Sequence, residues 1–288
     1  MNSTRRIKRS TPLTIAMLAA LAYFLIPLFW LAVSSTKSTQ DLFNTFGLWF
    51  SHAPQLLTNV RSTLSTNDGV FIRWMFNTVL YAGVSSVGAA FLAAFAGYGF
   101  AKYKFRGSKA GFNLVVGTIM VPTTALAIPT YLLFSNVGLV NTPWAVILPS
   151  LINPFGLYLM RIYAQDAVPD SLIEAARIDG AGELRIFFRI ALRLLAPGLV
   201  TVLLFTLVTT WNNYFLPLIM LNNPNLYPVT VGLSSWAAQA QNGGGGASSD
   251  MFSLVVTGSL LSIIPLVVAF LFLQRYWQSG LATGAVKQ

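Results

Sequence analysis

Hydrophobic residues run together along this chain in six segments, each about 20 residues long, which is the length that a helix needs to cross a bilayer. We place these segments at 12–33, 76–101, 112–134, 143–161, 195–220 and 252–273. Their interiors contain no Asp, Glu, Lys, Arg or His. The pattern predicts an all-α polytopic membrane protein with six transmembrane helices.

The composition agrees with this pattern. Hydrophobic residues make up 55% of the 288 residues and charged residues only 9%, with a mean hydropathy of +0.65. Soluble domains carry about 25% charged residues, so a soluble domain of ordinary surface is excluded. The basic N-terminus resembles a secretory leader, but its apolar run exceeds the usual length of about 7–15 residues. We therefore expect an uncleaved first span.

The lysines and arginines predict the orientation. If both termini lie in the cytoplasm, fifteen of the eighteen basic residues face it, and only Lys37, Arg61 and Arg73 lie outside. Cytoplasmic loops of membrane proteins carry an excess of basic residues, so we predict an N-in, C-in topology. The net charge of +10 then favours contact with membrane lipid rather than with nucleic acid.

A charged stretch, residues 166–197, interrupts this apolar chain and holds five of its eight acidic residues. Pro169 prevents a helix before it, and Ser171 and Glu174 have the spacing of a capping box. We predict a short helix over 171–179 that ends at Gly180 in the left-handed conformation.

A second helix is predicted from about residue 182. Its Arg185, Arg189 and Arg193 repeat every four residues and form one basic stripe. Four apolar residues lie opposite: Ile186, Phe187, Ile190 and Leu194. Such a helix is typical of the headgroup level of a membrane, with arginines on lipid phosphates and aromatic rings below.

The sequence Glu174-Ala175-Ala176, followed by Asp179-Gly180 and then Ile190-x-Leu192, resembles the EAA loop of ABC-importer permeases. In that family the loop forms coupling helices that dock in a cleft of a cytoplasmic ATPase. The resemblance therefore implies that Glu174, Ala175, Ala176, Asp179 and Gly180 couple this chain to an ATPase. The alternative is an ordinary pair of surface helices.

One position departs from the family pattern. The family usually has a proline directly after the Leu of this motif, where this chain has Arg193. Pro197 stands at the position of a second common proline. The departure at Arg193 concerns the kink that the family pattern leads us to expect after the coupling helices, and it does not concern docking.

Three further stretches are similar to the carbohydrate-class, maltose-type permeases: Phe205–Pro217, Tyr227–Thr230 and the tail after residue 273. The resemblance implies a type I ABC importer permease fold in three parts, with an N-terminal helix and external loop (1–75), a permease core (76–273) and a cytoplasmic tail (274–288). It also implies as partners a second, homologous permease, two copies of a cytoplasmic ATPase and an extracytoplasmic sugar-binding protein. The family places a contact with that binding protein in the loop 221–251, which we expect to be flexible.

The most polar patch inside a predicted span is Trp211, Asn212, Asn213 and Tyr214. Aromatic rings beside amides offer a sugar both apolar faces and hydrogen bonds, so these residues are candidates for the substrate path. Two amides in a membrane segment are also explained if they join helices. The breaks expected at Pro122, Pro129 and Asn153-Pro154 suit either a transport path or simple kinks.

The remaining chemistry is defined by what the sequence lacks. There is no cysteine and one histidine, His52, so we expect no metal site, no cofactor and no catalytic residue. The predicted spans lack the titratable groups of ion-coupled secondary transporters, and no Walker A sequence is present. We therefore predict a permease subunit of a prokaryotic sugar importer, located in the cell membrane and driven by a separate ATPase. The alternative is a passive channel or an ion-coupled secondary transporter, which leaves the charged stretch unexplained.

Overall fold

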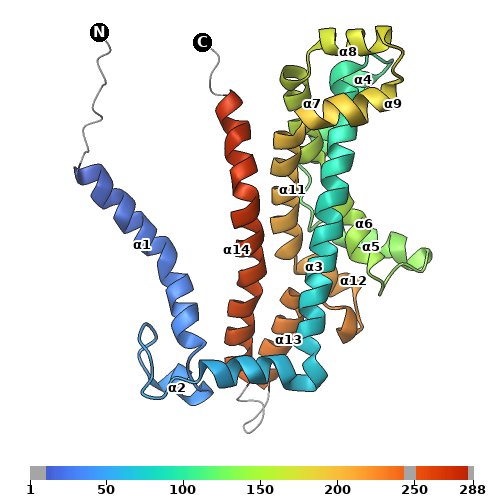
Figure 1. Cartoon of the computed structure of the whole chain (residues 1–288). Coiled ribbons are helices and arrows are strands. Elements are labelled where there is room, and N and C mark those ends of the chain that lie inside the picture. The colour runs from blue at the N-terminus through green and yellow to red at the C-terminus, as the bar shows by residue number, and fades with distance from the viewer. Residues whose placement is uncertain (1–10, 243–250, 285–288) are drawn as a thin grey trace. The chain divides into compact units, whose positions relative to one another are not determined.

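The computed structural model describes residues 11–242 and 251–284, with side chains up to residue 274, and all regular elements in these ranges are helices (Figure 1). The chain forms two compact units. The first comprises residues 1–69 and 233–261, and the second, here called the core unit, comprises residues 70–232 and 262–288. Three helices, α3, α13 and α14, contribute to both units.

The first unit contains α1 (Thr11–Ser34), α2 (Thr39–Asn44), the start of α3 (Leu56–Lys102), the end of α13 (Val229–Asn242) and the start of α14 (Met251–Gly284). The predicted external loop, residues 34–75, is therefore largely helical, because α2 and the first part of α3 lie within it. The most apolar 18-residue window of α1 has no buried residue, as expected for a helix whose solvent is lipid.

The segment between α1 and α3 folds around a buried lysine. Lys37 is 1% exposed, and its Nζ donates to Thr45 Oγ1 at 2.9 Å and to the Phe46 carbonyl at 2.7 Å. The Asn59 amide donates to the carbonyls of Ser35 and Lys37. A buried ammonium costs free energy unless it is hydrogen-bonded, so these oxygens explain why Lys37 is tolerated here.

A joint in α3 separates the two units. Asn67, Asp68 and Gly69 have φ angles of 51°, 56° and 76°, so the helix is broken there although it resumes at once. From residue 70 to Lys102 the helix contains no further break and no proline. At 1.5 Å per residue it is about 50 Å long.

The core unit is built mostly of short helices. After α3 they are α4 (Ser108–Thr118), α5 (Ala127–Asn136), α6 (Trp144–Leu151), α7 (Pro154–Ala167), α8 (Asp170–Ile178), α9 (Glu183–Ile186), the π-helical turn η1 (Phe187–Ala191), α10 (Leu192–Leu194), α11 (Ala196–Trp211), α12 (Phe215–Met220) and the 3-10 turn η2 (Pro224–Leu226). The predicted span over 112–134 is interrupted at Pro122, where a break is expected, whereas Pro129 lies inside a helix. Helical structure stops after Thr118 and resumes at Ala127, and Pro122, which has no N–H to donate, lies in this break.

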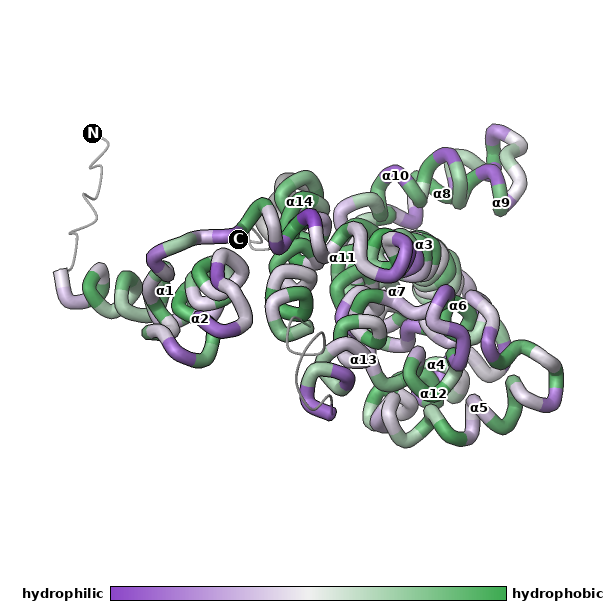
Figure 2. Tube along the Cα trace, turned by 90° about the horizontal axis from the view of Figure 1, so that it is seen from below, coloured by the Kyte–Doolittle hydropathy of each residue, from purple (hydrophilic) through white to green (hydrophobic). Residues whose placement is uncertain are grey.

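Four helical segments of the described residues are long and apolar enough to cross a membrane: Thr11–Ser34, Leu56–Lys102, Trp144–Ala167 and Met251–Gln274. Glu183–Leu194 and Ala196–Trp211 form a fifth if this pair, which is bent by 78°, counts as one span. The count of six and the N-in, C-in orientation stay predictions. Figure 2 shows hydrophobic residues along much of α11 and α14, and alternating hydrophilic and hydrophobic residues in α8 and α9. The helix α14 continues to Gly284, beyond the predicted end of the last span at residue 273.

Small residues bring α3 against α6 and α7. A Cβ atom on Gly88 would lie 2.4 Å from Leu151 Cδ2, and one on Gly97 would lie 2.7 Å from the Arg161 nitrogen. Ala90 and Ala94, between these glycines, are fully buried. The small residues of the second predicted span therefore allow close helix packing, the simpler of their possible roles.

Candidate functional site

The coupling arm, as we call residues 170–194, contains α8, α9, η1 and α10. Its first helix begins at Asp170, with Pro169 in an extended conformation at the N-cap position and no side-chain capping bond. The predicted capping box is therefore wrong. Ser171 lies inside the first turn, because the helix starts directly after the proline and places Asp170 at the positive end of the helix dipole.

The turn after α8 has the predicted left-handed glycine. Gly180 has a φ of 77°, its N–H donates to the Arg177 carbonyl at 3.0 Å, and the Ala181 N–H donates to the Ala176 carbonyl at 2.9 Å. These two bonds form a Schellman motif, which ends a helix and turns the chain sharply. Glycine is required because other residues pay a steric penalty at positive φ.

The second half of the arm runs into a bend. The π turn η1 is closed by the bond from the Leu192 N–H to the Phe187 carbonyl, and after α10 the chain bends by 78° into α11. Pro197 lies in the first turn of α11. The expected kink is thus present although Arg193 replaces the proline that the family pattern favours.

Two ion pairs hold the arm. Lys102 Nζ at the end of α3 lies 2.8 Å from Asp170 Oδ1, and Arg177 Nε lies 2.7 Å from Glu183 Oε1 across the Gly180 turn. The Tyr103 hydroxyl donates to Glu183 Oε2 at 2.5 Å. The Lys102–Asp170 pair therefore joins α3 to α8, and the Tyr103–Glu183 bond joins the residue after α3 to α9. The Arg177–Glu183 pair closes the turn between α8 and α9.

These contacts shift the pKa values of the groups that make them. The hydrogen bond and charge of Lys102 lower the pKa of Asp170, and the hydrogen bonds from Arg177 and Tyr103 lower the pKa of Glu183. Burial and the bond to Glu183 raise the pKa of Tyr103. Both carboxylates are therefore ionised, and the phenol is protonated, at neutral pH.

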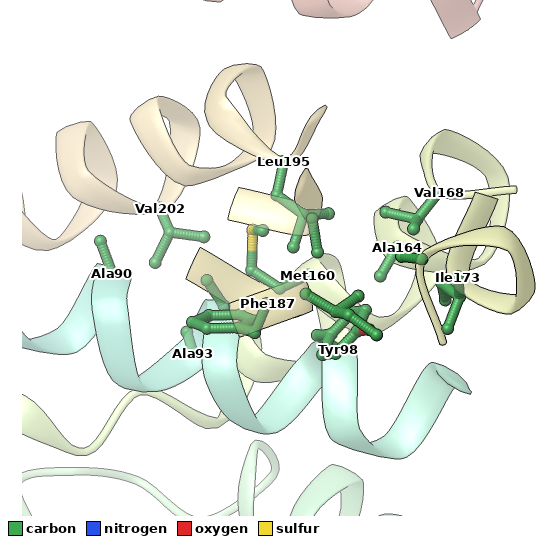
Figure 3. Close-up of a cluster of buried hydrophobic side chains, with 14 residues drawn as sticks. Ala90, Ala93, Tyr98, Met160, Ala164, Val168, Ile173, Phe187, Leu195 and Val202 are labelled. Atoms are coloured by element: carbon green, nitrogen blue, oxygen red, sulfur yellow. The ribbon is translucent and has the colours of Figure 1, made fainter. Parts of the chain in front are cut away.

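A hydrophobic cluster lies beneath the arm (Figure 3). Ile173 of α8 and Phe187 of η1 are 3% and 1% exposed, and they pack in one buried cluster with Tyr98 of α3, Met160 of α7 and Leu195. Burying an aromatic or a large aliphatic side chain contributes about 1.5–3 kcal/mol, more than an exposed ion pair does. The cluster therefore dominates the attachment of the arm, and the ion pairs define its orientation.

The predicted coupling residues divide into two groups. Glu174, Ala175, Asp179 and Gly180 are exposed, whereas Ala176 is only 8% exposed and belongs to the buried cluster. Ala176 therefore supports the helix from its inner side. The sequence interpretation missed Tyr103, because its link to Glu183 joins residues 80 positions apart.

The candidate substrate-path residues lie at a break between two helices. α11 ends at Trp211, α12 begins at Phe215, and Asn212, Asn213 and Tyr214 connect them. Asn212 and Tyr214 are exposed, Asn213 is half-buried and Trp211 is only 6% exposed. Three of the four candidates are thus accessible at the break, and the indole is packed inside.

The two amide side chains bond within their own segment. Asn212 Nδ2 donates to the Val208 carbonyl at 2.9 Å, and Asn213 Oδ1 accepts weakly from the Leu216 N–H at 3.4 Å. The link to another helix uses the Asn213 main-chain carbonyl instead, which accepts from Thr230 Oγ1 at 2.8 Å. Within the described residues, neither of these two bonds of the amide side chains joins α11 to a distant helix, and contact with a substrate stays a prediction.

A second broken segment contains a polar link that the sequence interpretation did not assign. Asn153 caps α7, because its Oδ1 accepts from the Gly156 N–H at 2.7 Å. Its Nδ2 donates to Thr206 Oγ1 of α11 at 2.8 Å. The kink at Asn153-Pro154 is therefore a capped helix start that also joins α7 to α11.

Residues 221–228, here called the strap, follow α12 and are bound by side chains of α3. The Trp74 indole donates to the Pro224 carbonyl, the Asn77 amide to the Asn225 and Tyr227 carbonyls, and the Tyr81 hydroxyl to the Leu226 carbonyl, at 2.8–3.0 Å. The Asn141 amide oxygen accepts from the N–H groups of Asn222 and Asn223 at 3.0 and 2.9 Å.

The prediction of a flexible loop over 221–251 is wrong for most of its length. The strap is bound on both sides, and α13 follows it from Val229 to Asn242. The four glycines at 243–246 lie outside the described residues. In the part of the chain that the structure describes, no cluster of three or more His, Asp or Glu could hold a metal ion.

Comparison with known proteins places the chain in a family. The family model described as "Binding-protein-dependent transport system inner membrane component" matches residues 86–282. The chain belongs to this family. It is accordingly a multi-pass inner membrane component of an ABC transport system, and its matched region includes the whole coupling arm.

Two named relatives match this chain over nearly its whole length. The chain is 31% identical over 276 residues to the arabinooligosaccharides transport system permease protein AraQ of Bacillus subtilis (strain 168), covering 96% of this chain and 95% of that protein. It is 30% identical to the lactose transport system permease protein LacG of Rhizobium radiobacter, covering 93% of each chain.

A solved structure confirms the fold. The chain superimposes, with a TM-score of 0.79, on a chain of a bacterial ABC transporter involved in the import of the acidic polysaccharide alginate. The match covers 96% of this chain and 100% of the other, at 22% sequence identity. The predicted all-α ABC importer permease fold is confirmed.

Proposed function

We propose that this chain is a permease subunit of an ATP-driven importer for oligosaccharides or related carbohydrates. The named relatives support this, because their names specify arabinooligosaccharides and lactose, and a further relative with 32% identity over 224 residues is the maltodextrin permease protein MdxG of Bacillus subtilis. Membership in a binding-protein-dependent family leaves no support for a passive channel or an ion-coupled transporter.

The coupling arm is the observation that carries this proposal. Four exposed residues, Glu174, Ala175, Asp179 and Gly180, lie on a helix and turn whose inner side is buried in a cluster with residues of α3 and α7. A displacement of α8 therefore moves the helices packed beneath it. This arrangement suits docking on a cytoplasmic ATPase, with two ATPase copies serving this chain and a second, homologous permease.

This assignment determines what each subunit of the transporter does. ATP is bound and hydrolysed on the partner ATPase, and this chain contributes no catalytic residue and needs no cofactor of its own. An extracytoplasmic binding protein delivers the sugar to the external side of the core unit. The break at Asn212, Asn213 and Tyr214 supplies amides, a hydroxyl and an aromatic ring for contact with the sugar along the path.

Reconstitution tests the proposal directly. The chain, co-expressed with a second permease and an ATPase, is placed in proteoliposomes with the matching binding protein outside. We expect ATP-dependent accumulation of at least one sugar from a panel of arabinooligosaccharides, lactose and maltodextrin. Accumulation that is independent of ATP, or that follows an ion gradient, would contradict the assignment.

The contact with sugar is tested by Asn213→Leu and Tyr214→Ala. Loss of a hydrogen bond to substrate costs about 0.5–1.5 kcal/mol, so uptake should fall about two- to tenfold. The assembled complex should elute unchanged in size-exclusion chromatography. If the complex instead fails to assemble, these residues join helices and do not contact the sugar.

A further inference from the structure

The helix that follows the Gly180 turn lies at a steep angle to a membrane span. The segment from Glu183 to Leu194 meets α11 at 78°. Since α11 lies in the segment 195–220 that the sequence predicts to span the membrane, a helix bent from it by 78° runs close to the plane of the membrane surface. Helices in this position bind lipid when one side is basic and the other apolar.

The basic side of this helix consists of Arg185, Arg189 and Arg193, all of them exposed. Two ion pairs are formed by the described residues, and neither involves these arginines. In an ideal α-helix, residues four apart are offset by about 40° around the axis. The wider π turn η1 reduces this offset, so the three guanidinium groups lie more nearly in one row.

The apolar side is equally open. Phe188 is 49% exposed, and its ring stacks on that of Phe91 of α3 with 6.0 Å between centroids. Phe91 in turn stacks on Phe95 at 6.3 Å, and these two rings are 37% and 44% exposed. The three rings form a continuous aromatic surface that extends from the helix along α3, toward the middle of the span.

A groove of about 330 Å³ adjoins this surface between α3 and α9. Its walls are almost entirely apolar and include Phe95, Tyr98, Phe105, Leu184 and Phe187. Glu183 is the one carboxylate on its rim, and Arg177 neutralises it. No negative charge is thus left unpaired at the groove.

We propose that this helix and the adjoining surface of α3 bind an anionic phospholipid. The phosphate lies on Arg185, Arg189 and Arg193, and an acyl chain lies along Phe188, Phe91 and Phe95. Guanidinium groups bind phosphate oxygens in pairs, and each basic residue near an anionic membrane surface adds about fivefold in affinity, equivalent to about 1 kcal/mol. Charge complementarity selects an anionic lipid over a zwitterionic one.

The test compares lipid retention by charge variants of the assembled transporter. The transporter is placed in nanodiscs containing equal amounts of phosphatidylglycerol and phosphatidylcholine. It is then released from the nanodiscs, and the lipid molecules that stay bound to it are counted by native mass spectrometry. We expect preferential retention of phosphatidylglycerol. Arg185→Gln, Arg189→Gln and Arg193→Gln combined should reduce its retention about 100-fold. Arg189→Gln alone should reduce it about fivefold and serves if the triple variant does not assemble.

A matched control removes the same charge from another exposed basic stretch. Lys104, Arg106 and Lys109 are exposed, and all three follow α3 at or near the start of α4. Their combined change to Gln should leave phosphatidylglycerol retention unchanged. Equal retention by the two triple variants, or equal retention of both lipids by the unmodified transporter, would overturn the proposal. Equal retention of phosphatidylglycerol and phosphatidylcholine would mean that the surface binds lipids without regard to the charge of the headgroup.

Discussion

The coupling arm and the strap are both bound to α3, but by different kinds of contact. The arm is held by charged side chains paired with charged side chains, above a buried cluster of large apolar residues. The strap is held by neutral side chains of α3 that donate to main-chain carbonyls. One uninterrupted stretch of helix, residues 70 to 102, connects the two attachments.

The difference determines which sequence changes each region tolerates. The arm depends on the identity of its own side chains, since Ile173, Asp170 and Glu183 all make contacts that hold it. The strap depends on its backbone, so the side chains of Asn222, Pro224 and Asn225 stay exposed. An attachment of this kind fixes the path of the strap while these three exposed side chains can vary, whereas Leu221 is buried in a hydrophobic cluster.

The largest effect is expected at the turn of the arm. Gly180→Val forces a β-branched residue to a φ of 77°, at a cost of about 1–2 kcal/mol, and alters the angle between α8 and α9. We expect loss of ATPase binding to the permease and loss of sugar uptake, with the permease itself still folded. The control is Gly182→Ser, since Gly182 has a φ of −71° at a helix N-cap, where serine is favoured. Normal uptake with Gly180→Val would contradict the role of the arm.

The next largest effect should come from the anchor of the strap. A Cβ atom on Gly232 would lie 2.2 Å from the Trp74 ring, so Gly232→Ala must displace the indole that binds the strap. Overpacking of this kind costs about 1–3 kcal/mol. We expect faster hydrogen exchange of residues 221–228 and a lower unfolding temperature. Gly83→Ala on α3 is the matched control, because no atom of the described residues lies within 4 Å of its added Cβ.

A smaller effect is expected from Glu183→Gln. The Arg177–Glu183 pair is about half exposed, and such pairs contribute about 0–1 kcal/mol, so ATPase affinity should fall by no more than about fivefold. Hydrogen exchange of residues 170–186 should rise at the same time. Glu174→Gln should leave this exchange unchanged and cause only a mild loss of coupling, through contact with the ATPase. Faster exchange in both variants would show that Glu174 also holds the arm.

The smallest effect concerns pH and salt. The pKa values of Asp170 and Glu183 are lowered by their partners, so the stabilisation is complete at neutral pH and is lost as the pH falls through these lowered pKa values. Raising the salt concentration to 1 M at neutral pH should weaken the same pairs by screening. The rate of amide hydrogen exchange in the arm, corrected for the intrinsic pH dependence of exchange, should rise both at low pH and at 1 M salt. Hydrogen exchange of the strap should not rise, since the side chains of the described residues that bind it are neutral.

The sequence predicts best where the determining contacts are local. The turn at Gly180 and the start of the second arm helix follow from a glycine and a charged pattern within a few residues, and the structure confirms both. The capping box fails because the helix already begins at Asp170, directly after the N-cap residue Pro169, so that Ser171 lies inside the first turn. The span predicted over 112–134 contains a break of eight residues between Thr118 and Ala127, which average hydropathy does not register and which Pro122 signals.

Contacts between distant residues explain the rest. The strap binds residues about 150 positions earlier, and it does so through carbonyl groups, which every residue carries. No sequence pattern identifies such a site. Asn153 was visible as the start of a kink, but its bond to Thr206 depends on the packing of α7 against α11. The family motif likewise does not show which of its residues face outward, and Ala176 is buried whereas the other four coupling residues are exposed.

The π turn in the arm also has a mechanical consequence. Five residues, Phe187 to Ala191, complete a turn closed by a bond that spans one residue more than an α-helical bond does. If that bond shifted to the α-helical register, the chain before it would rotate about the helix axis by the angle of one residue, about 100°. The Gly180 turn and α8 would rotate with it relative to α11. Such a rotation would withdraw Ile173 from the buried cluster, so the packing of the arm also holds the π turn in its register and determines which side of α8 faces outward.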